Sequence, residues 1–378
     1  MKAGITEYFL ELVQIDSESK NERAIVDKLK TDLIELGFTV EEDECYQKTG
    51  GNAGNIYAFL SGKIDRKPLL FCAHVDTVRP GLGVKPQESE DRISSDGTTV
   101  LGADDKSGVA QIMFGIKSIV ESGIDYPPME VLFTVSEEIG LLGAKHFDKA
   151  KLKSRIGYVL DSEDIGEFMI GAPSQNSIAI KVIGKEAHAG AEPEKGINAI
   201  RVAAEAIASI PIGRIDFETT ANIGIINGGM ATNIVPNMVE IKGEARSHNM
   251  DKLAQVTNDI VSAFHKAAER HKLEHCEAKV EIDVHTEYKS FYMDEAQEVV
   301  KIAKKSLSNL QITPILRKGG GGSDANILNA EGISLIIAGT GMHSYHTVNE
   351  FILKEDLSKG AEIVCELIRC YAQTDASL

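Results

Sequence analysis

Leu69-Leu70-Phe71-Cys72-Ala73-His74-Val75-Asp76-Thr77 is an apolar run that ends in a histidine and an aspartate. Such a run is typical of a strand that is buried on both faces of a parallel sheet. Open α/β sheets place their chemistry at the carboxyl ends of these strands. Because side chains alternate along a strand, we expect His74 and Asp76 on one face, where Asp76 can hold one imidazole nitrogen while the other binds a metal ion. Taken alone, such a pair is more often an ordinary strand end than a metal site.

The composition is that of a globular protein. The 378 residues are 43% hydrophobic and 26% charged, and no apolar run approaches the ~20 residues that a membrane helix needs. The formal charge of −17 argues against a nucleic-acid partner, because that affinity depends on lysine and arginine. We therefore expect no nucleic-acid and no membrane partner.

The cysteines and the first residues indicate the compartment. Five cysteines are scattered without a Cys-x-x-Cys pair, which predicts neither a disulfide framework nor a cysteine zinc site. Residues 1–11 carry acids among their apolar positions and predict an amphipathic helix, with no secretory signal. A cytoplasmic location follows from both observations.

The pattern of predicted elements changes along the chain. Residues 1–172 and 288–378 alternate helices and strands, which predicts an α/β domain. Between them, residues 173–287 predict strand-helix-strand-strand-helix-strand, the order of a ferredoxin-like α+β domain. We expect one domain inserted into the other. Asp96-Gly97 also predicts a two-residue hairpin between strands at 93–95 and 98–100.

Further acidic and histidine residues fall where predicted strands end or a helix begins. An acid pair before a helix is usually a cap, so each segment alone is unremarkable. Gathered in one pocket, four carboxylates would be costly unless protons or cations neutralised them, and two divalent ions would supply that balance. The residues concerned are Asp104, Glu137, Glu138, Asp161 and His346, in addition to His74.

With these motifs the sequence resembles the co-catalytic zinc metallopeptidases, the family that includes peptidase T, carboxypeptidase G, aminoacylase-1 and succinyl-diaminopimelate desuccinylase. The resemblance covers nearly the whole chain. It implies a zinc-peptidase-like catalytic domain with a mixed central sheet flanked by helices, and a lid and dimerisation domain at 173–287. It also implies a homodimer and two divalent metal ions per subunit, with Zn2+ preferred and Mn2+ or Co2+ as alternatives.

The resemblance assigns roles to single residues. Glu137 matches the general base that acts on metal-activated water, Asp76 the support of a metal-bound histidine, and His188 the residue that stabilises the oxyanion, in its own or a neighbouring subunit. Asp104 matches the ligand shared by both ions, and its bond to Asp105 occupies the position of a cis peptide in the family. The implied metal ligands are His74, Asp104, Glu138, Asp161 and His346. The implied substrate contacts are Arg246, Asn233, Gly321 and Gly322.

Several of these positions have a second interpretation. His188 fits an ordinary loop histidine, and Arg246 fits a surface ion pair. The glycine run before Ser323 fits a plain helix start that Ser323 or Asp324 caps. His343 competes with His346, which we prefer because His346-Thr347-Val348-Asn349-Glu350 matches the family's His-x-x-Asn-Glu pattern.

Within the family the sequence is most similar to peptidase T, through Gly102-Ala103-Asp104-Asp105-Lys106, Asp161 and Tyr345-His346. This implies an aminopeptidase that releases the N-terminal residue of short peptides, in particular tripeptides. Ser162-Glu163-Asp164 stands where peptidase T has glycines, which leaves the exact substrate open. The alternatives are a carboxypeptidase or N-acyl-amino-acid amidohydrolase of the same family, and a metal-dependent binding protein.

Overall fold

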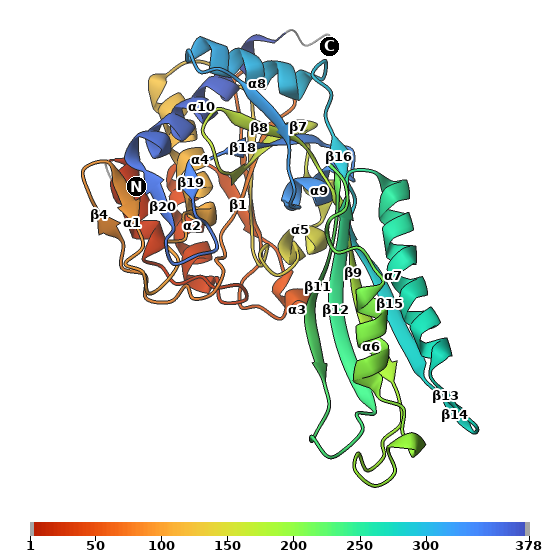
Figure 1. The fold of residues 1–378 in the computed structure, drawn as a ribbon. Helices are drawn as coiled ribbons and strands as arrows, with labels where there is room; N and C mark the ends of the chain where they lie inside the picture. Colours follow the sequence, from red (N-terminus) through yellow and green to blue (C-terminus); the bar gives the residue numbers. More distant parts are fainter. Residues whose placement is uncertain (1–3, 375–378) are drawn as a thin grey trace. The chain divides into compact units, whose positions relative to one another are not determined.

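The computed structural model describes residues 4–374, which form two compact units. Unit 1 contains the described residues of segments 1–171, 292–319 and 323–378, and unit 2 contains Ala172–Phe291 and Gly320–Gly322. Figure 1 shows the central sheet of unit 1 among its helices, and the long strands of unit 2 beside two helices.

Unit 1 is built on a mixed nine-stranded sheet. Its strands β3, β6, β7 and β18 run parallel to one another, whereas β2 pairs antiparallel with β6. Every residue of β3 and of β6 is buried, as the apolar run at Leu69 predicts. The sheet order is β1 (Thr39–Glu42), β2 (Ile56–Leu60), β6 (Met129–Thr134), β3 (Leu69–His74), β7 (Ile156–Ser162), β18 (Ser334–Gly339), β8 (Glu167–Ala172) and β16 (Phe291–Tyr292), with β17 (Ile315–Lys318) paired to β8.

Helices flank this sheet, so the predicted fold class is confirmed. Helix α4 packs against β3 and β7, and α10 packs against both α4 and α8. Each fully buried Leu, Ile or Phe side chain in such an interface contributes about 1.5–3 kcal/mol. The helices of unit 1 are α1 (Ile5–Val13), α2 (Arg23–Glu35), α3 (Tyr46–Thr49), α4 (Ala103–Ser122), α5 (Leu142–His146), α8 (Glu298–Asn309), α9 (Asp324–Asn329) and α10 (Lys354–Gln373), with a 3-10 turn at Lys149–Lys151.

A small second sheet corrects the predicted hairpin. Strand β5 (Arg92–Ser94) pairs with β4 (Gln87–Glu88) and β20 (Phe351–Leu353), and β20 pairs with β19 (Met342–His343). Residues 98–100 form no strand. The Asp96 side chain instead accepts hydrogen bonds from the N–H and hydroxyl of Thr98, and this local turn replaces the strand ladder.

Unit 2 is an antiparallel sheet with two helices. Its strands lie in the order β10 (Gly213–Arg214), β11 (Thr219–Gly228), β12 (Met238–Ser247), β9 (Ser174–Ile183) and β15 (Lys279–Tyr288). Together with α6 (Ala199–Ala208) and α7 (Met250–Arg270), this is the ferredoxin-like succession of elements. A hairpin of β13 (Lys272–Leu273) and β14 (Cys276–Glu277) and a 3-10 turn at Pro193–Lys195 complete the unit.

Capping residues and apolar periodicity explain the two helices of unit 2. The side chain of Asn249 accepts from the N–H groups of Asp251 and Lys252, and Asn198 accepts from Arg201. In α7 the buried residues recur every three or four positions and pack against the sheet. They include Leu253, Val256, Ile260, Phe264 and Ala267.

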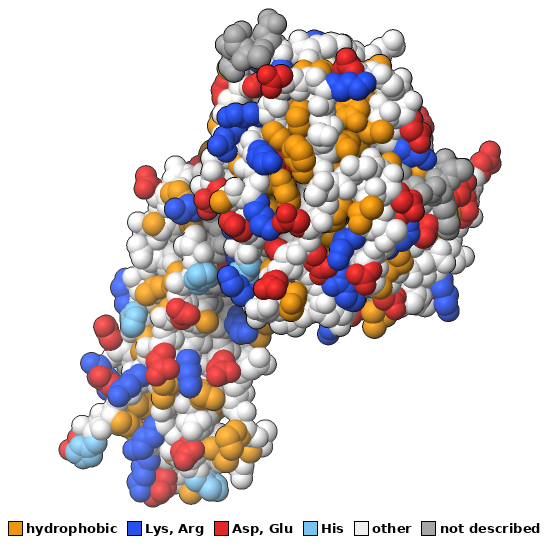
Figure 2. All heavy atoms as spheres, turned by 180° about the vertical axis from the view of Figure 1, so that it is seen from behind, with side chains coloured by type: hydrophobic (Ala, Val, Ile, Leu, Met, Phe, Trp, Pro, Cys, Tyr) orange, Lys and Arg blue, Asp and Glu red, His pale blue; other side chains and the backbone are white. Residues whose placement is uncertain are grey.

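The surface carries both signs of charge. On the face that Figure 2 shows, acidic and basic side chains are interspersed among apolar ones. None of the helices within residues 4–374 is long and apolar enough to cross a membrane.

Candidate metal centre

His74 ends β3 as a buried side chain surrounded by aspartates. Its Nε2 lies 2.9 Å from Asp104 Oδ1 and 3.8 Å from Asp161 Oδ1. Its Nδ1 lies 3.0 Å from the backbone carbonyl of Asp76 and 3.5 Å from that residue's carboxylate. Nδ1 is therefore held by Asp76, and Nε2 points toward the carboxylates of Asp104 and Asp161.

Asp104 places a histidine on each of its oxygens. Its Oδ1 faces His74, and its Oδ2 lies 3.0 Å from Nε2 of His346. The same His346 nitrogen lies 3.0 Å from Glu138 Oε1. The peptide bond between Asp104 and Asp105 is cis. His343 lies elsewhere, with its Nε2 4.0 Å from Asp356 Oδ2.

Two sets of side chains are close enough together to hold a cation. His74, Asp104 and Glu138 form one, and His74, Asp105 and Asp161 form the other, with their ligand atoms within 4.8 Å of one another in each. Asp105 is a residue that the sequence analysis did not assign. Its Oδ2 accepts the backbone N–H of His74 at 3.2 Å, so it also fixes the end of β3.

Asp76 holds the chain that carries the two glutamates. Its Oδ1 accepts the N–H of Glu137 at 2.9 Å, and its Oδ2 accepts the N–H of Glu138 at 3.2 Å. The hydroxyl of Ser19 donates to Oδ2 at 2.7 Å. Asp76 thus supports both His74 and the segment that follows β6.

A second carboxylate, Glu350, holds the loop that leads to Asp104. Its Oε1 accepts the N–H of Asp104 at 3.0 Å, and its Oε2 accepts those of Leu101 and Gly102 at 2.6 and 2.7 Å. In the sequence, Glu350 stands out only as the last residue of the motif that begins at His346. It lies 246 positions from Asp104 along the chain. Only the fold brings these residues together.

Burial and like charges raise the pKa of several of these acids. The pKa of Glu137 is raised well above its ordinary value, first by burial and then by the neighbouring Asp161. Burial likewise raises the pKa of Asp161 and of Glu138. These groups stay ionised together only if positive charge balances them.

Neighbouring carboxylates raise the pKa of the two histidines. Burial alone would lower the pKa of His74, but the Asp104 and Asp76 carboxylates outweigh it and raise the pKa. Hydrogen bonds to Asp104 and Glu138 raise the pKa of His346 to about 10. A divalent cation would take the place of those protons. This set of imidazoles and carboxylates fits zinc, manganese or cobalt.

Two of the predicted residues of unit 2, His188 and Asn233, lie outside its long strands and helices. His188 is exposed, and its Nδ1 accepts the N–H groups of Gly190 and Ala191 at 3.2 and 3.1 Å. Asn233 is also exposed, and its carbonyl accepts the N–H of Ala189 at 2.9 Å. Both residues lie where the segments 187–189 and 233–235 run side by side.

Arg246 is held by an acid of its own strand. Its Nε and one Nη donate to the two oxygens of Glu244 at 2.8 and 3.0 Å. Gln175 donates to the same carboxylate at 2.9 Å and accepts from the hydroxyl of Tyr288 at 2.6 Å. The ion pair that the second interpretation of Arg246 requires is therefore present. It leaves one edge of the guanidinium for another partner.

The glycine run combines a close contact with a helix cap. A side chain at Gly322 would meet the Tyr288 ring at 2.1 Å, whereas one at Gly321 would meet open space. Ser323 caps α9 and forms a capping box with Asn326, as the helix-start interpretation predicts. Asp324 follows as a buried acid whose pKa is raised to about 6 by burial.

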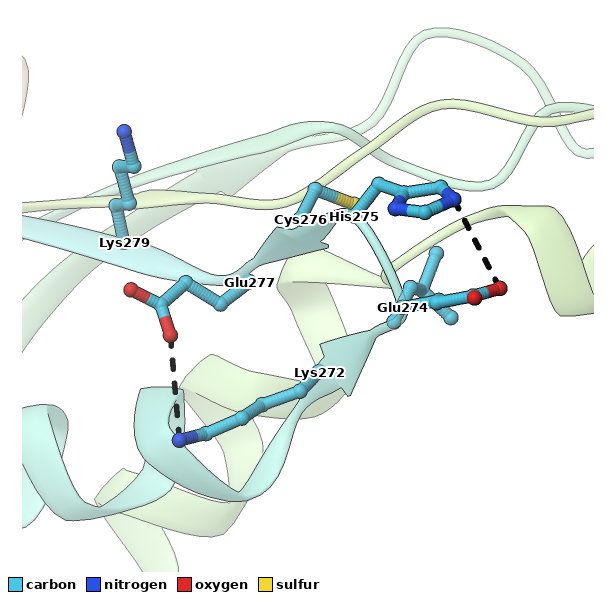
Figure 3. Close-up of a pocket in the computed structure, with 7 residues that line it drawn as sticks. Lys272, Glu274, His275, Cys276, Glu277 and Lys279 are labelled. Carbon is cyan, nitrogen blue, oxygen red and sulfur yellow. Dashed lines mark ion pairs between the residues drawn. The ribbon is translucent and has the colours of Figure 1, made fainter.

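A separate hollow lies on the β13–β14 hairpin. It has a volume of about 440 Å³, and residues 272–277 and Lys279 line it. Figure 3 shows Lys272 paired with Glu277 and His275 paired with Glu274, at 3.9 and 3.7 Å. Both of its glutamates thus have a basic partner, unlike the crowded acids of unit 1.

Fold and site together define a metallopeptidase. The profile of Peptidase family M20/M25/M40 matches residues 70–369. The chain therefore belongs to this family, which confirms the resemblance seen in the sequence.

Similar proteins cover almost the whole chain. The uncharacterized protein YqjE of Bacillus subtilis is 42% identical over 365 residues, which span 96% of this chain and 97% of YqjE. The structure of aminopeptidase PepT from Bacillus cereus is 40% identical with a TM-score of 0.89, and it covers 98% of both chains. A tripeptidase from Staphylococcus aureus is 39% identical with a TM-score of 0.93, again over 98% of both chains.

Proposed function

We propose that this peptidase is a two-metal aminopeptidase that releases the N-terminal residue of short peptides, in particular tripeptides. The observation that carries the proposal is the pair of histidines on opposite oxygens of Asp104. The aminopeptidase and tripeptidase named above, at 40% and 39% identity, support the class of substrate.

In this proposal His74 and Asp161 hold one cation, His346 and Glu138 hold the other, and Asp104 is shared. Zn2+ is the preferred ion, with Mn2+ or Co2+ as alternatives. When bound, the two ions acidify a water molecule and polarise the scissile carbonyl.

Glu137 acts as the general base. It is 9% exposed, lies among the acids that would hold the cations, and is not itself one of the proposed ligands. It takes the proton of the attacking water and passes it to the leaving amine. Asp76 keeps Glu137 in place through the backbone hydrogen bond at 2.9 Å.

Unit 2 supplies the remaining contacts of the proposal as a lid. His188 stabilises the oxyanion through Nε2, because its Nδ1 already accepts two backbone hydrogen bonds. Arg246 binds the substrate carboxylate with the guanidinium edge that Glu244 does not use. Asn233 and the backbone of Gly321 and Gly322 complete the substrate contacts.

We also propose a cytoplasmic homodimer in which unit 2 provides the interface. Strand β10 pairs with β11 only at Thr220 and Ala221, so within residues 4–374 the outer edge from Ile223 to Gly228 has no strand neighbour. Ile225 and Ile226 on this edge are 49% and 51% exposed. An exposed apolar edge suits pairing with a second copy. A monomer mass by light scattering at micromolar concentration would contradict the dimer.

A peptide panel tests the activity. Metal-loaded protein is incubated with unblocked di-, tri- and tetrapeptides and with N-acylated amino acids, and products are identified by mass spectrometry. We expect release of the N-terminal residue, fastest from tripeptides. Release of a C-terminal residue or of an acyl group would select the carboxypeptidase or amidohydrolase alternative, and metal retention without any turnover would select a binding protein.

A further inference from the structure

Three successive backbone N–H groups after β6 each donate to a buried carboxylate. Those of Glu137 and Glu138 go to Asp76, and that of Ser136 goes to Glu22 Oε1 at 3.0 Å. Ser136 has φ of +54°, in the left-handed region that residues other than glycine rarely adopt. The segment 136–138 is thus a tight corner, and two different acids hold it.

Glu22 reaches this corner from the start of α2. Its side chain is completely buried, and its Oε1 also accepts the Ser136 hydroxyl and the Lys20 N–H, each at 2.8 Å. Glu22 is the N-cap residue of α2, yet its side chain makes no capping hydrogen bond. Its Oε2 has no hydrogen-bond partner within residues 4–374.

Burying Glu22 in this way costs more free energy than a purely structural role requires. A serine or aspartate would cap α2 at the same position. A buried carboxylate with an unpaired oxygen is unfavourable, and proteins keep such groups mainly where function requires them. Besides the nearby N–H of Lys20, the group that Glu22 holds is Ser136, which lies 114 positions away in the sequence.

We propose that Glu22 is a positioning residue for Glu137. It fixes the N–H and hydroxyl of Ser136 and thereby sets the direction in which Glu137 leaves β6. The inference rests on the proposed role of Glu137 as general base. Glu22 would act on Glu137 through Ser136, and small displacements of a reacting group are enough to lower a rate strongly.

The chain offers a matched control on the same strand. Glu130, near the start of β6, is also completely buried and accepts both the N–H of Ser154, at 2.9 Å, and its hydroxyl. Glu130 and Ser154 thus repeat the contacts of Glu22 and Ser136 at the opposite end of β6. A purely structural effect of removing such a contact should appear in both pairs.

The test compares Glu22→Gln and Ser136→Ala with Glu130→Gln and Ser154→Ala in the metal-loaded enzyme. We expect the first two to lower kcat on a tripeptide by about 10- to 100-fold, with KM and metal content as in the unmodified protein. The Glu130 and Ser154 variants should keep kcat, even where their melting temperature falls. Ser136→Ala decides the question if Glu22→Gln does not fold.

A double variant tests whether the effect passes through Glu137. If it does, Glu22→Gln lowers the residual rate of Glu137→Gln little further, because the group that it positions is already gone. A full additional loss, a raised KM, a loss of metal, or an equal decrease in Glu130→Gln would each overturn the inference. An inactive unmodified protein, or a fully active Glu137→Gln variant, would refute the proposed function instead.

Discussion

Strand β6 has a buried glutamate near its start, Glu130, and another just beyond its end, Glu137. Glu130 accepts from the hydroxyl of Tyr57 at 2.7 Å, from the N–H groups of Lys153 and Ser154 at 3.0 and 2.9 Å, and from the Ser154 hydroxyl. Burial raises the pKa of Glu137 and outweighs the opposing effect of His74, while Asp161, Asp324 and Glu138 raise it further. The first glutamate has four hydrogen-bond donors, whereas the second lies among three other acids and a histidine.

This difference distinguishes an acid with a structural role from one with a proposed chemical role on the same strand. An acid with donors of its own is held in place by them and anchors the chain. An acid among acids must take up a proton or share a cation, which makes it suitable for moving protons. The number of donors around a buried acid thus indicates its role better than its burial does.

The largest effect is expected from Glu137→Gln. It should lower kcat about 10²- to 10⁴-fold, because the amide cannot accept the proton of the attacking water. Metal analysis should give the same content as in the unmodified protein, since no ligand changes. Glu130→Gln should keep kcat but lower the free energy of unfolding by about 1–3 kcal/mol. Metal loss in Glu137→Gln would mean that the base and a ligand have been exchanged in our assignment.

A pair of histidine variants tests which histidine belongs to the metal centre. His346→Ala should lose one of the two cations and most of the activity, because His346 faces both Asp104 and Glu138. His343→Ala should retain both ions. Mass spectrometry of the native protein measures the stoichiometry. Equal metal loss in the two variants would contradict the placement of His346.

Removal of the metals should destabilise the protein, because the carboxylates around His74 then lack a balancing positive charge. A chelator is expected to lower the free energy of unfolding by about 2–4 kcal/mol, and added Zn2+ should restore it. In the metal-free protein the pKa of Glu137 is raised, that of Asp324 to about 6 and that of His346 to about 10. The folded state then binds more protons than the unfolded chain, so stability falls as pH rises from about 5 to 8.

Denaturant titrations at several pH values check this slope. The metal-loaded protein should show a smaller one, because the cations replace the protons. A metal-free protein whose stability rises over this range would show that the acids of the cluster ionise without a counter-charge.

The smallest effect concerns Glu42, another acid with donors of its own. Burial opposes its ionisation, but Arg23, at 2.6 Å, and Lys30, at 2.7 Å, outweigh it and lower its pKa to about 2. Glu42→Gln should cost about 1–2 kcal/mol at neutral pH. Because the folded pKa lies below the ordinary 4.5, the difference from the unmodified protein should vanish as pH falls from about 4.5 to 2. A difference that persists at pH 2 would contradict the assigned charge.

Much of the cluster could be predicted because its parts are local. His74, Asp104 and Asp161 each end a strand or begin a helix that has a clear apolar pattern, and parallel strands bring such ends to one edge. The family motif then related His346 to them. Periodicity also predicted the strand and helix order of unit 2.

The supporting residues could not be found in this way. Glu22, Ser19 and Glu350 act on segments far away in the sequence, and no local pattern marks a side chain that holds a distant backbone. The predicted hairpin at Asp96 was wrong for a related reason, because β5 pairs with β4 and with the distant β20. The pairing of Arg246 with Glu244, by contrast, agrees with their spacing, because residues two apart in a strand share a face.

The position of β18 also constrains how the protein is made. This strand pairs with both β7 and β8, although about 160 residues of chain, including nearly all of unit 2, separate it from them. During synthesis the central sheet stays open until Gly339 has emerged, whereas Ala172–Phe291 is already complete. Nearly all of unit 2 has therefore been synthesised while the central sheet of unit 1 still exposes strand edges.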